Sequence, residues 1–151
     1  MPTARPIDSF SMSLRVSLID PPIPQAAWQA ALPYLHKSIA ESPVRLSVDD
    51  FLRLIDTAQM QLWLGAEHSQ TQAAMITELV NYPLVKVCRA IHLGAENGAV
   101  QPFLKVAFNE VMRWARANGC NRFELVGRLG WQRMLSEYGF EAKTVHMEKI
   151  L

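Results

Sequence analysis

Three strand-like segments follow one another between residues 60 and 93, and this run constrains the fold more than any other feature of the chain. The segments cover residues 60–65 (MQLWLG), 73–81 (AAMITELVN) and 84–93 (LVKVCRAIHL). Only short polar connectors separate them, and connectors of this length join strands that lie side by side and antiparallel. The run therefore predicts an antiparallel meander at the centre of the fold.

The residues before this run predict one strand and two helices. Residues 14–19 alternate apolar and polar side chains, as a half-buried strand does. Residues 25–40 carry apolar side chains at helical spacing, and Pro33 is expected to kink or split this helix. Ser47, followed three positions later by Asp50, is typical of a helix N-terminus, so a short helix is expected to begin there.

The residues after the run predict two helices and two strands. Pro102 suits the first position of a helix over residues 102–118, and Gly119 suits its end. A strand over 122–126, a helix over 131–138 and a last strand over 144–151 follow. The full order is β-α-α-β-β-β-α-β-α-β, which predicts an α+β fold with a mostly antiparallel sheet flanked by helices.

The chain divides into an N-terminal arm and one domain. Six of the nine prolines lie in the first 33 residues, and residues 1–13 have the composition of an arm outside the core. We expect residues 14–151 to form a single domain, and the arm to contact a protein partner or a second copy of the chain.

Charge and composition exclude several classes of function. A net charge of +1 lacks the basic excess of nucleic-acid binders, so no nucleic-acid partner is predicted. No apolar run approaches the roughly 20 residues of a membrane span. The two cysteines, Cys88 and Cys120, form no metal-binding pattern and no disulfide framework. These observations predict a cytoplasmic protein with neither a metal site nor a membrane contact.

The C-terminal half resembles the GCN5-related N-acetyltransferase (GNAT) superfamily. The resemblance lies in the helix end Trp114 to Cys120 (WARANGC), the strand Phe123 to Val126 (FELV), and Tyr138-Gly139-Phe140. The segment Gly127 to Trp131 (GRLGW) with this Gly-Phe pair is similar to the ends of small GNAT-like proteins of bacteriophage genomes. The resemblance implies the α+β fold already predicted, and a host-cytoplasmic or virion location if a phage encodes the chain.

The resemblance also implies a place for acetyl-CoA, between the fourth and fifth strands and at the start of the long helix. Helix N-termini favour anions because their first N–H groups are unpaired. The contacts that the resemblance implies are Leu93, Gly94, Gly98, Ala99 and Phe103. The sequence departs from the family's phosphate-loop pattern at Ala99, Pro102 and Leu104. Pro102 has no backbone N–H to donate to a phosphate, and Leu104 has a bulky side chain where the phosphate is expected to approach. Leu135 stands where many family members carry a tyrosine acid.

Two residues are candidates for the general base that an acetyl transfer to an amine uses. Glu78 lies within the second strand of the meander, and His92 lies near the end of the third. Either side chain could accept a proton from an amine, although each also fits an ordinary structural position.

Two functions follow from these observations. The departures favour a GNAT-fold protein that has lost acetyl-CoA binding and acts as a binding or assembly module, for example in a phage particle. The alternative is an active N-acetyltransferase that uses acetyl-CoA. An open cleft between the diverging strands, with free amides around residues 98–103, would favour the enzyme. A cleft filled by Leu104 or Phe103 would favour the assembly protein.

Overall fold

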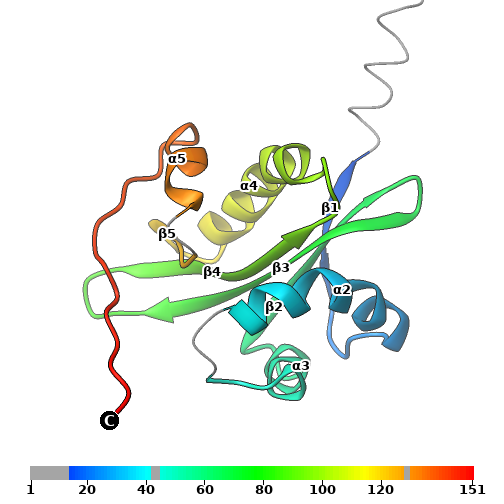
Figure 1. Cartoon of the computed structure of the whole chain (residues 1–151), viewed down its shortest axis with the longest axis horizontal. Coiled ribbons are helices and arrows are strands. Elements are labelled where there is room, and N and C mark those ends of the chain that lie inside the picture. Colours follow the sequence, from blue (N-terminus) through cyan, green and yellow to red (C-terminus); the bar gives the residue numbers. More distant parts are fainter. Residues whose placement is uncertain (1–13, 42–44, 128–129) are drawn as a thin grey trace, which may run out of the picture.

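The computed structural model describes residues 14–41, 45–127 and 130–151. The predicted arm, residues 1–13, lies outside the described residues. Figure 1 shows a twisted sheet with α4 and α5 on one side and α2 and α3 on the other. The α+β class predicted from the sequence is confirmed.

Five strands form one sheet in the order β1-β2-β3-β4-β5. They are β1 (Arg15–Ile19), β2 (Met60–Glu67), β3 (Gln70–Asn81), β4 (Lys86–Ala95) and β5 (Arg122–Leu125). The first four strands pair antiparallel, so the predicted meander is confirmed. β5 joins β4 in the parallel direction, after the chain has crossed over through a helix.

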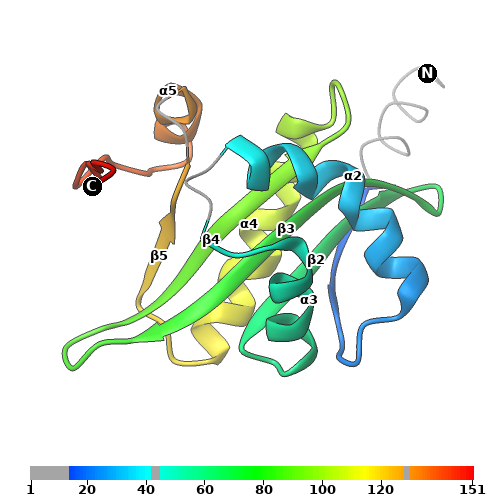
Figure 2. The same cartoon turned by 60° about the horizontal axis from the view of Figure 1, so that its bottom comes forward.

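Four helices in the described ranges cover the sheet. They are α2 (Gln25–Glu41), α3 (Val48–Asp56), α4 (Val100–Ala117) and α5 (Trp131–Ser136). Figure 2 shows α2 and α3 in front of the sheet and α4 behind it. Each face carries its own core: Leu35, Phe51 and Ile76 are buried on the α2/α3 face, and Met75, Phe103 and Val111 on the α4 face.

The helices agree with the local sequence signals, except at two prolines. The Ser47 side chain accepts from the Asp50 amide and the Asp50 carboxylate accepts from the Ser47 amide, which forms a full capping box. Pro33 does not split α2, because it lies on the exposed side of the helix, where water can bond the carbonyl that lost its donor. Pro102 is the third residue of α4 rather than the first.

A hydrogen-bonded chain of polar groups crosses the α4 face of the sheet. Trp63 Nε1 donates to Thr77 Oγ1 (3.0 Å), and the Thr77 hydroxyl donates to Gln61 Oε1 (2.9 Å). Thr77 is fully buried, so these bonds satisfy a polar group that would otherwise be costly to bury.

One predicted boundary and one predicted strand are wrong in the second half of the chain. β4 does not stop at Gly94 but continues through it to Ala95, because Ala73 and Ala74 of β3 extend the ladder. The predicted last strand, residues 144–151, is irregular and exposed. Its alternating pattern is present, but none of the strands in the described part of the chain lies beside it to complete a ladder.

No helix among the described residues is long and apolar enough to cross a membrane.

Candidate functional site

A cleft opens where β4 and β5 separate. The pairing of the two strands begins at Val87↔Arg122 and ends at Ala90↔Leu125. β4 then continues to Ala95, with no strand beside it on that side among the described residues. The backbone of this half of β4 therefore forms a wall of the cleft.

A β-bulge at Ile91 decides which backbone groups face the cleft. Before the bulge, the Val126 amide donates to the Ala90 carbonyl (3.0 Å), so Ala90 faces β5. After it, the Glu96 amide donates to the Gln72 carbonyl (2.7 Å), so even-numbered residues now face β3. The register shows the extra residue, because Thr77 pairs with Ala90 and Ile76 pairs with His92. Alternation along the strand then turns the amide and carbonyl of Leu93 toward the cleft.

The bulge also places two neighbouring side chains on the same face. Ile91 packs into the core beneath α2 and α3, and the His92 ring meets the Phe51 ring edge-on at 5.0 Å. In a regular strand, consecutive side chains would point to opposite faces. His92 therefore reaches the α2 side of the cleft because Ile91 is the extra residue.

The cleft has a volume of about 490 Å³, within the range of small-molecule sites. Its walls come from α2, the end of β4, the start of α4, and the residues that follow β5. The lining residues are Pro33, Tyr34, Lys37, Ser38, Glu41, Ala90, Ile91, His92, Leu93, Gly94, Ala95, Asn97, Val100, Phe103, Leu125, Val126, Gly127 and Trp131.

The start of α4 offers backbone donors at one end of the cleft. Val100 and Gln101 are its first two residues, and the amides of a first helical turn have no intrahelical acceptor. Pro102 contributes no amide, and the Phe103 amide is already bonded to the Ala99 carbonyl (2.9 Å). Gly98 has φ +78°, and a Cβ added there would meet nothing within 4 Å. The helix start is thus open, with fewer donors than an ordinary first turn.

His92 is held in one orientation by α2. Its Nδ1 lies 2.8 Å from the Ser38 hydroxyl oxygen, and only 8% of the residue is exposed. Burial lowers the pKa of His92 below its ordinary value, because the charged imidazolium loses solvation. At neutral pH the ring is therefore uncharged and can accept a proton.

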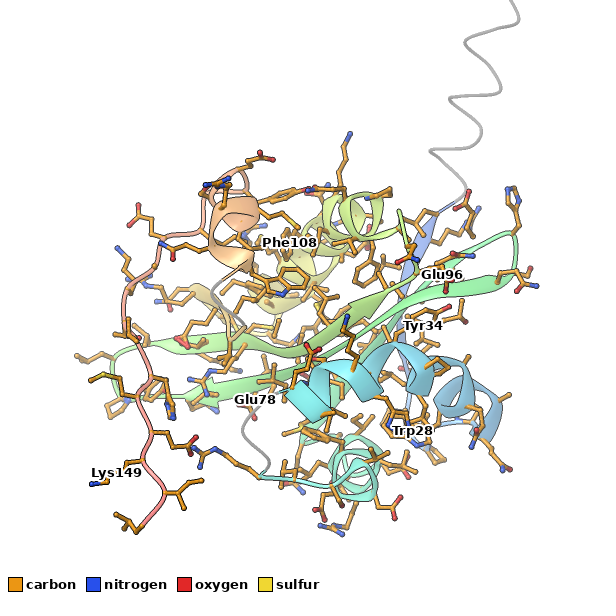
Figure 3. The ribbon with its side chains drawn as sticks, in the orientation of Figure 1. Trp28, Tyr34, Glu78, Glu96, Phe108 and Lys149 are labelled. Carbon is orange, nitrogen blue, oxygen red and sulfur yellow. The ribbon has the colours of Figure 1, made fainter. Side chains whose placement is uncertain are left out.

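Tyr34 ties α2 to the loop after β4. Its hydroxyl donates to the Thr71 carbonyl (2.8 Å) and lies 3.0 Å from Glu96 Oε2. Figure 3 shows Tyr34 and Glu96 pointing toward each other. Burial and the neighbouring Glu96 carboxylate raise the pKa of the Tyr34 phenol, so it stays protonated as a donor. The Tyr34 carbonyl also packs against Gly94, where an added Cβ would lie 1.8 Å from the oxygen.

The cleft contains some of the residues named from the sequence and not others. Leu93, Gly94, Phe103 and His92 line it, whereas the lining residues do not include Gly98 or Ala99.

Glu78 lies elsewhere on the sheet. Its carboxylate is 3.2 Å from Arg89, which also bonds Glu124 at 3.1 Å, and it does not line the cleft.

The two bulky residues expected at the cofactor loop have different positions. Leu104 does not approach the cleft: it is fully buried between α4 and α5 beside Phe108 and Leu135. The expectation that Leu104 obstructs a phosphate is therefore wrong, because the helix turns its side chain to the opposite side. Phe103 forms the floor of the cleft and packs over Gly65, where an added Cβ would lie 2.5 Å from its ring.

Sequence reasoning missed the contribution of α2. Tyr34, Lys37, Ser38 and Glu41 line the cleft from one edge of this helix. Their spacing of three, four and seven residues is the available signal, since it marks one stripe of a helix. Within the described residues, no group of three or more His, Cys, Asp or Glu side chains could hold a metal ion.

Comparison with known proteins identifies the fold. No protein-family model and no curated protein sequence matches the chain. Among solved structures, an acetyltransferase from Trypanosoma brucei is 13% identical with a TM-score of 0.69, over 91% of this chain and 99% of that one. Glucosamine-6-phosphate N-acetyltransferase from Arabidopsis thaliana is 12% identical with a TM-score of 0.65, over 91% and 97%.

A third similar structure carries the family name. It is a GNAT family acetyltransferase from Staphylococcus aureus, 11% identical with a TM-score of 0.64, over 93% of this chain and 100% of that one. Similarity at this level of identity concerns the arrangement of the backbone. The described sheet and helices thus have the fold of the GNAT acetyltransferases.

Proposed function

We propose that the chain is an N-acyltransferase that uses acetyl-CoA to acetylate an amine. The observation that carries this proposal is the Leu93 amide, which the bulge at Ile91 turns into the cleft. A backbone amide at this place can bond the oxygen of an acyl group and stabilise negative charge that develops on it. A module that had lost its ligand would have no use for a cleft built in this way.

The edge of β4 and the start of α4 suit two different parts of an acyl-CoA molecule. The unpaired edge of β4 can bond an extended amide-containing chain, as one strand bonds another. The open space at Gly98 and the amides of Val100 and Gln101 suit a phosphate group. Because Pro102 removes one donor, we expect the phosphate to be held less tightly than by a complete helix turn. When bound, acetyl-CoA would supply an activated acetyl group.

His92 is the base in this proposal. The neutral ring can accept the proton that the amine loses when its nitrogen bonds to the acetyl carbon and the thiol departs. In this proposal Nδ1–H donates to the Ser38 hydroxyl oxygen at 2.8 Å, so Nε2 is the unprotonated ring nitrogen that accepts the proton from the amine. Glu78 is unsuited to the role because it is paired with Arg89 outside the cleft.

Acetyl-CoA binding to the full chain tests the proposal, by calorimetry or by thermal unfolding with the ligand. At 100 times its Kd a ligand stabilises the folded state by about 2.7 kcal/mol, which raises the Tm of a chain of this size by roughly 5 to 10 °C. We expect a shift of this order with acetyl-CoA and a smaller one with free acetate.

A pair of tryptophan variants places the binding in the cleft. Asn97→Trp puts bulk into the cleft, and Asn109→Trp puts the same bulk on the exposed side of α4. Only the first should abolish the shift. If the unmodified chain gives neither heat nor a shift, the proposal is overturned and the binding or assembly function is supported instead.

A further inference from the structure

Two charged side chains line the described part of the cleft, and both come from α2. They are Lys37 and Glu41. The other titratable groups of the lining are uncharged, because burial keeps His92 neutral and the Tyr34 phenol stays protonated. The α2 wall of the cleft therefore carries one cation and one anion.

The Lys37 ammonium has no carboxylate partner in the described ranges. Glu41 lies four residues further along the same stripe of α2, yet the two side chains form no ion pair. A lysine that precedes a glutamate by four residues is less favourable for such a pair than the reverse order. Lys37 is also exposed, so its charge is available to a ligand in the cleft.

The position of Lys37 along the cleft follows from two contacts between α2 and β4. The Tyr34 carbonyl packs against Gly94, and the Ser38 hydroxyl bonds His92 at 2.8 Å. Four helical residues rise about 6 Å and two strand residues about 6.6 Å, so α2 runs along the end of β4 in the opposite direction. Lys37 directly precedes Ser38 and therefore lies close to the level of His92.

This position assigns Lys37 to the acceptor end of the cleft rather than to the phosphate end. The proposed phosphate site is at Gly98 and the first amides of α4. Among the lining residues of α2, Tyr34 is the one that bonds the loop leading to that site, through Glu96 at 3.0 Å. Lys37 is almost one helical turn nearer to the proposed base, His92.

We propose that the amine acceptor carries an anionic group, a carboxylate or a phosphate, within a few bonds of its nitrogen, and that Lys37 binds this group. The inference rests on the proposed acetyl transfer. The ammonium of a lysine acts as a point charge and suits either anion. As the new N–C bond forms, the C–S bond breaks with its electron pair on sulfur, and the amine proton passes to His92. The anionic group is unchanged.

The size and charge of the cleft restrict the acceptor further. Its volume of about 490 Å³ must hold the acyl end of the donor as well as the acceptor, so the acceptor is small. Glu41 adds a negative charge one turn beyond Lys37, and like charges repel. An anionic group is therefore favoured at Lys37 and disfavoured further along α2.

Paired acceptors test this inference once calorimetry has measured acetyl-CoA binding to the full chain. The pairs are glycine with glycinamide, β-alanine with β-alaninamide, and phosphoethanolamine with ethanolamine. In at least one pair, we expect kcat/KM for the anionic member to exceed that of its uncharged partner tenfold or more. The two amides are the less basic amines, and their larger neutral fraction works against the expected result. The phosphate pair distinguishes a phosphate from a carboxylate.

Variants of Lys37 assign the preference to this side chain. Lys37→Met keeps the length of the side chain, and we expect it to raise KM for the anionic acceptor about tenfold. The kcat, the KM of the uncharged partner and the Kd of acetyl-CoA should stay within twofold. Lys37→Arg should retain the preference. Lys149→Met is the matched control, because Lys149 is exposed on the C-terminal segment, away from α2 (Figure 3).

The contrary outcomes separate this inference from the proposed function. If acetyl-CoA does not bind, both are overturned. If acetyl-CoA binds but the members of every pair react alike, or none reacts, only the anionic acceptor is overturned. If Lys37→Met weakens acetyl-CoA binding as much as it raises the acceptor KM, Lys37 holds a phosphate of the donor, and the inference is again overturned.

Discussion

The two sides of β5 differ in how the strand ends its pairing. Toward β4, it pairs over four residues and then diverges, which leaves a cleft lined by polar groups of α2 and by the edge of β4. Away from β4, it pairs with nothing among the described residues, and a groove lies between it and residues 140–144, which we call the outer groove. The cleft lies beside the part of β4 that follows the bulge at Ile91, and the groove lies beside residues 140–144, which form no strand.

This difference separates two kinds of unpaired strand edge, one that lines an enclosed cleft and one that borders an exposed, irregular segment. The cleft is enclosed by packed elements on three sides, and its polar groups have defined partners such as Ser38 with His92. The outer groove is bounded on one side by an irregular segment whose continuation is exposed. We therefore expect the cleft to keep its shape in an isolated chain.

A side chain added at Gly94, where α2 contacts β4, should have the largest effect on stability. A Cβ at this residue would lie 1.8 Å from the Tyr34 carbonyl oxygen, so Gly94→Ala requires α2 or β4 to move. We expect a loss of about 3 kcal/mol or more in the free energy of unfolding, because both elements are packed. Denaturant unfolding measures this loss.

Gly130→Ala is the matched control. A Cβ at Gly130 would meet nothing within 4 Å, so this variant should unfold within about 0.5 kcal/mol of the unmodified chain. If both variants unfold alike, the close packing of α2 on β4 is contradicted.

Removal of the proposed base should have the next largest effect. His92→Gln retains polarity but lacks a basic nitrogen, and we expect kcat/KM for amine acetylation to fall about 100-fold. Since the pKa of His92 is lowered, the acidic limb of the pH profile should lie below pH 6.5 in the unmodified chain and vanish in the variant. An unchanged profile would assign the base elsewhere.

The same residue should affect the pH dependence of stability. The folded-state pKa lies below the unfolded value of about 6.5, so protons bind the unfolded state first. His92 therefore favours unfolding as the pH falls through 6.5 toward the folded pKa. Unfolding of the two chains at pH 7.5 and pH 5 measures this contribution, and the loss on acidification should be smaller in His92→Gln.

The smallest effect is expected at the wall of the outer groove. Phe140→Leu keeps an apolar side chain but removes the ring contacts with Phe108 and Phe123. We expect a loss of about 1 kcal/mol in the free energy of unfolding, and acetyl-CoA binding within twofold of the unmodified chain. A large loss of acetyl-CoA binding would show that the two sides of β5 are not independent.

The sequence predicted the elements whose signals are local. The capping box at Ser47 and Asp50 specifies the start of α3 within four residues. The apolar runs and short connectors specify the meander of β2, β3 and β4 in the same way. Leu93, Gly94, Phe103 and His92 were also placed at the cleft, through the resemblance to the acetyltransferases.

The features that the sequence did not predict depend on contacts between residues that are far apart along the chain. Nothing within residues 84–93 marks Ile91 as the extra residue, because the bulge is defined by the register with β3. The alternation of residues 144–151 predicts a strand, but whether a strand forms depends on which edge is available to it. The position of Leu104 depends on where α4 begins, and that start is two residues earlier than Pro102 suggests.

The bulge at Ile91 makes the cleft sensitive to the register of β4 more than to the identity of its residues. If the same residues formed a regular ladder with β3 from Ala90 onward, the Leu93 amide would turn toward β3 and His92 would lie on the α4 face. Deletion of Ile91, the extra residue, would instead keep Ala90 opposite Thr77 and His92 opposite Ile76, so both would hold their positions. Among descendants of this sequence, β4 should therefore tolerate any change at Ile91 that preserves these two pairings.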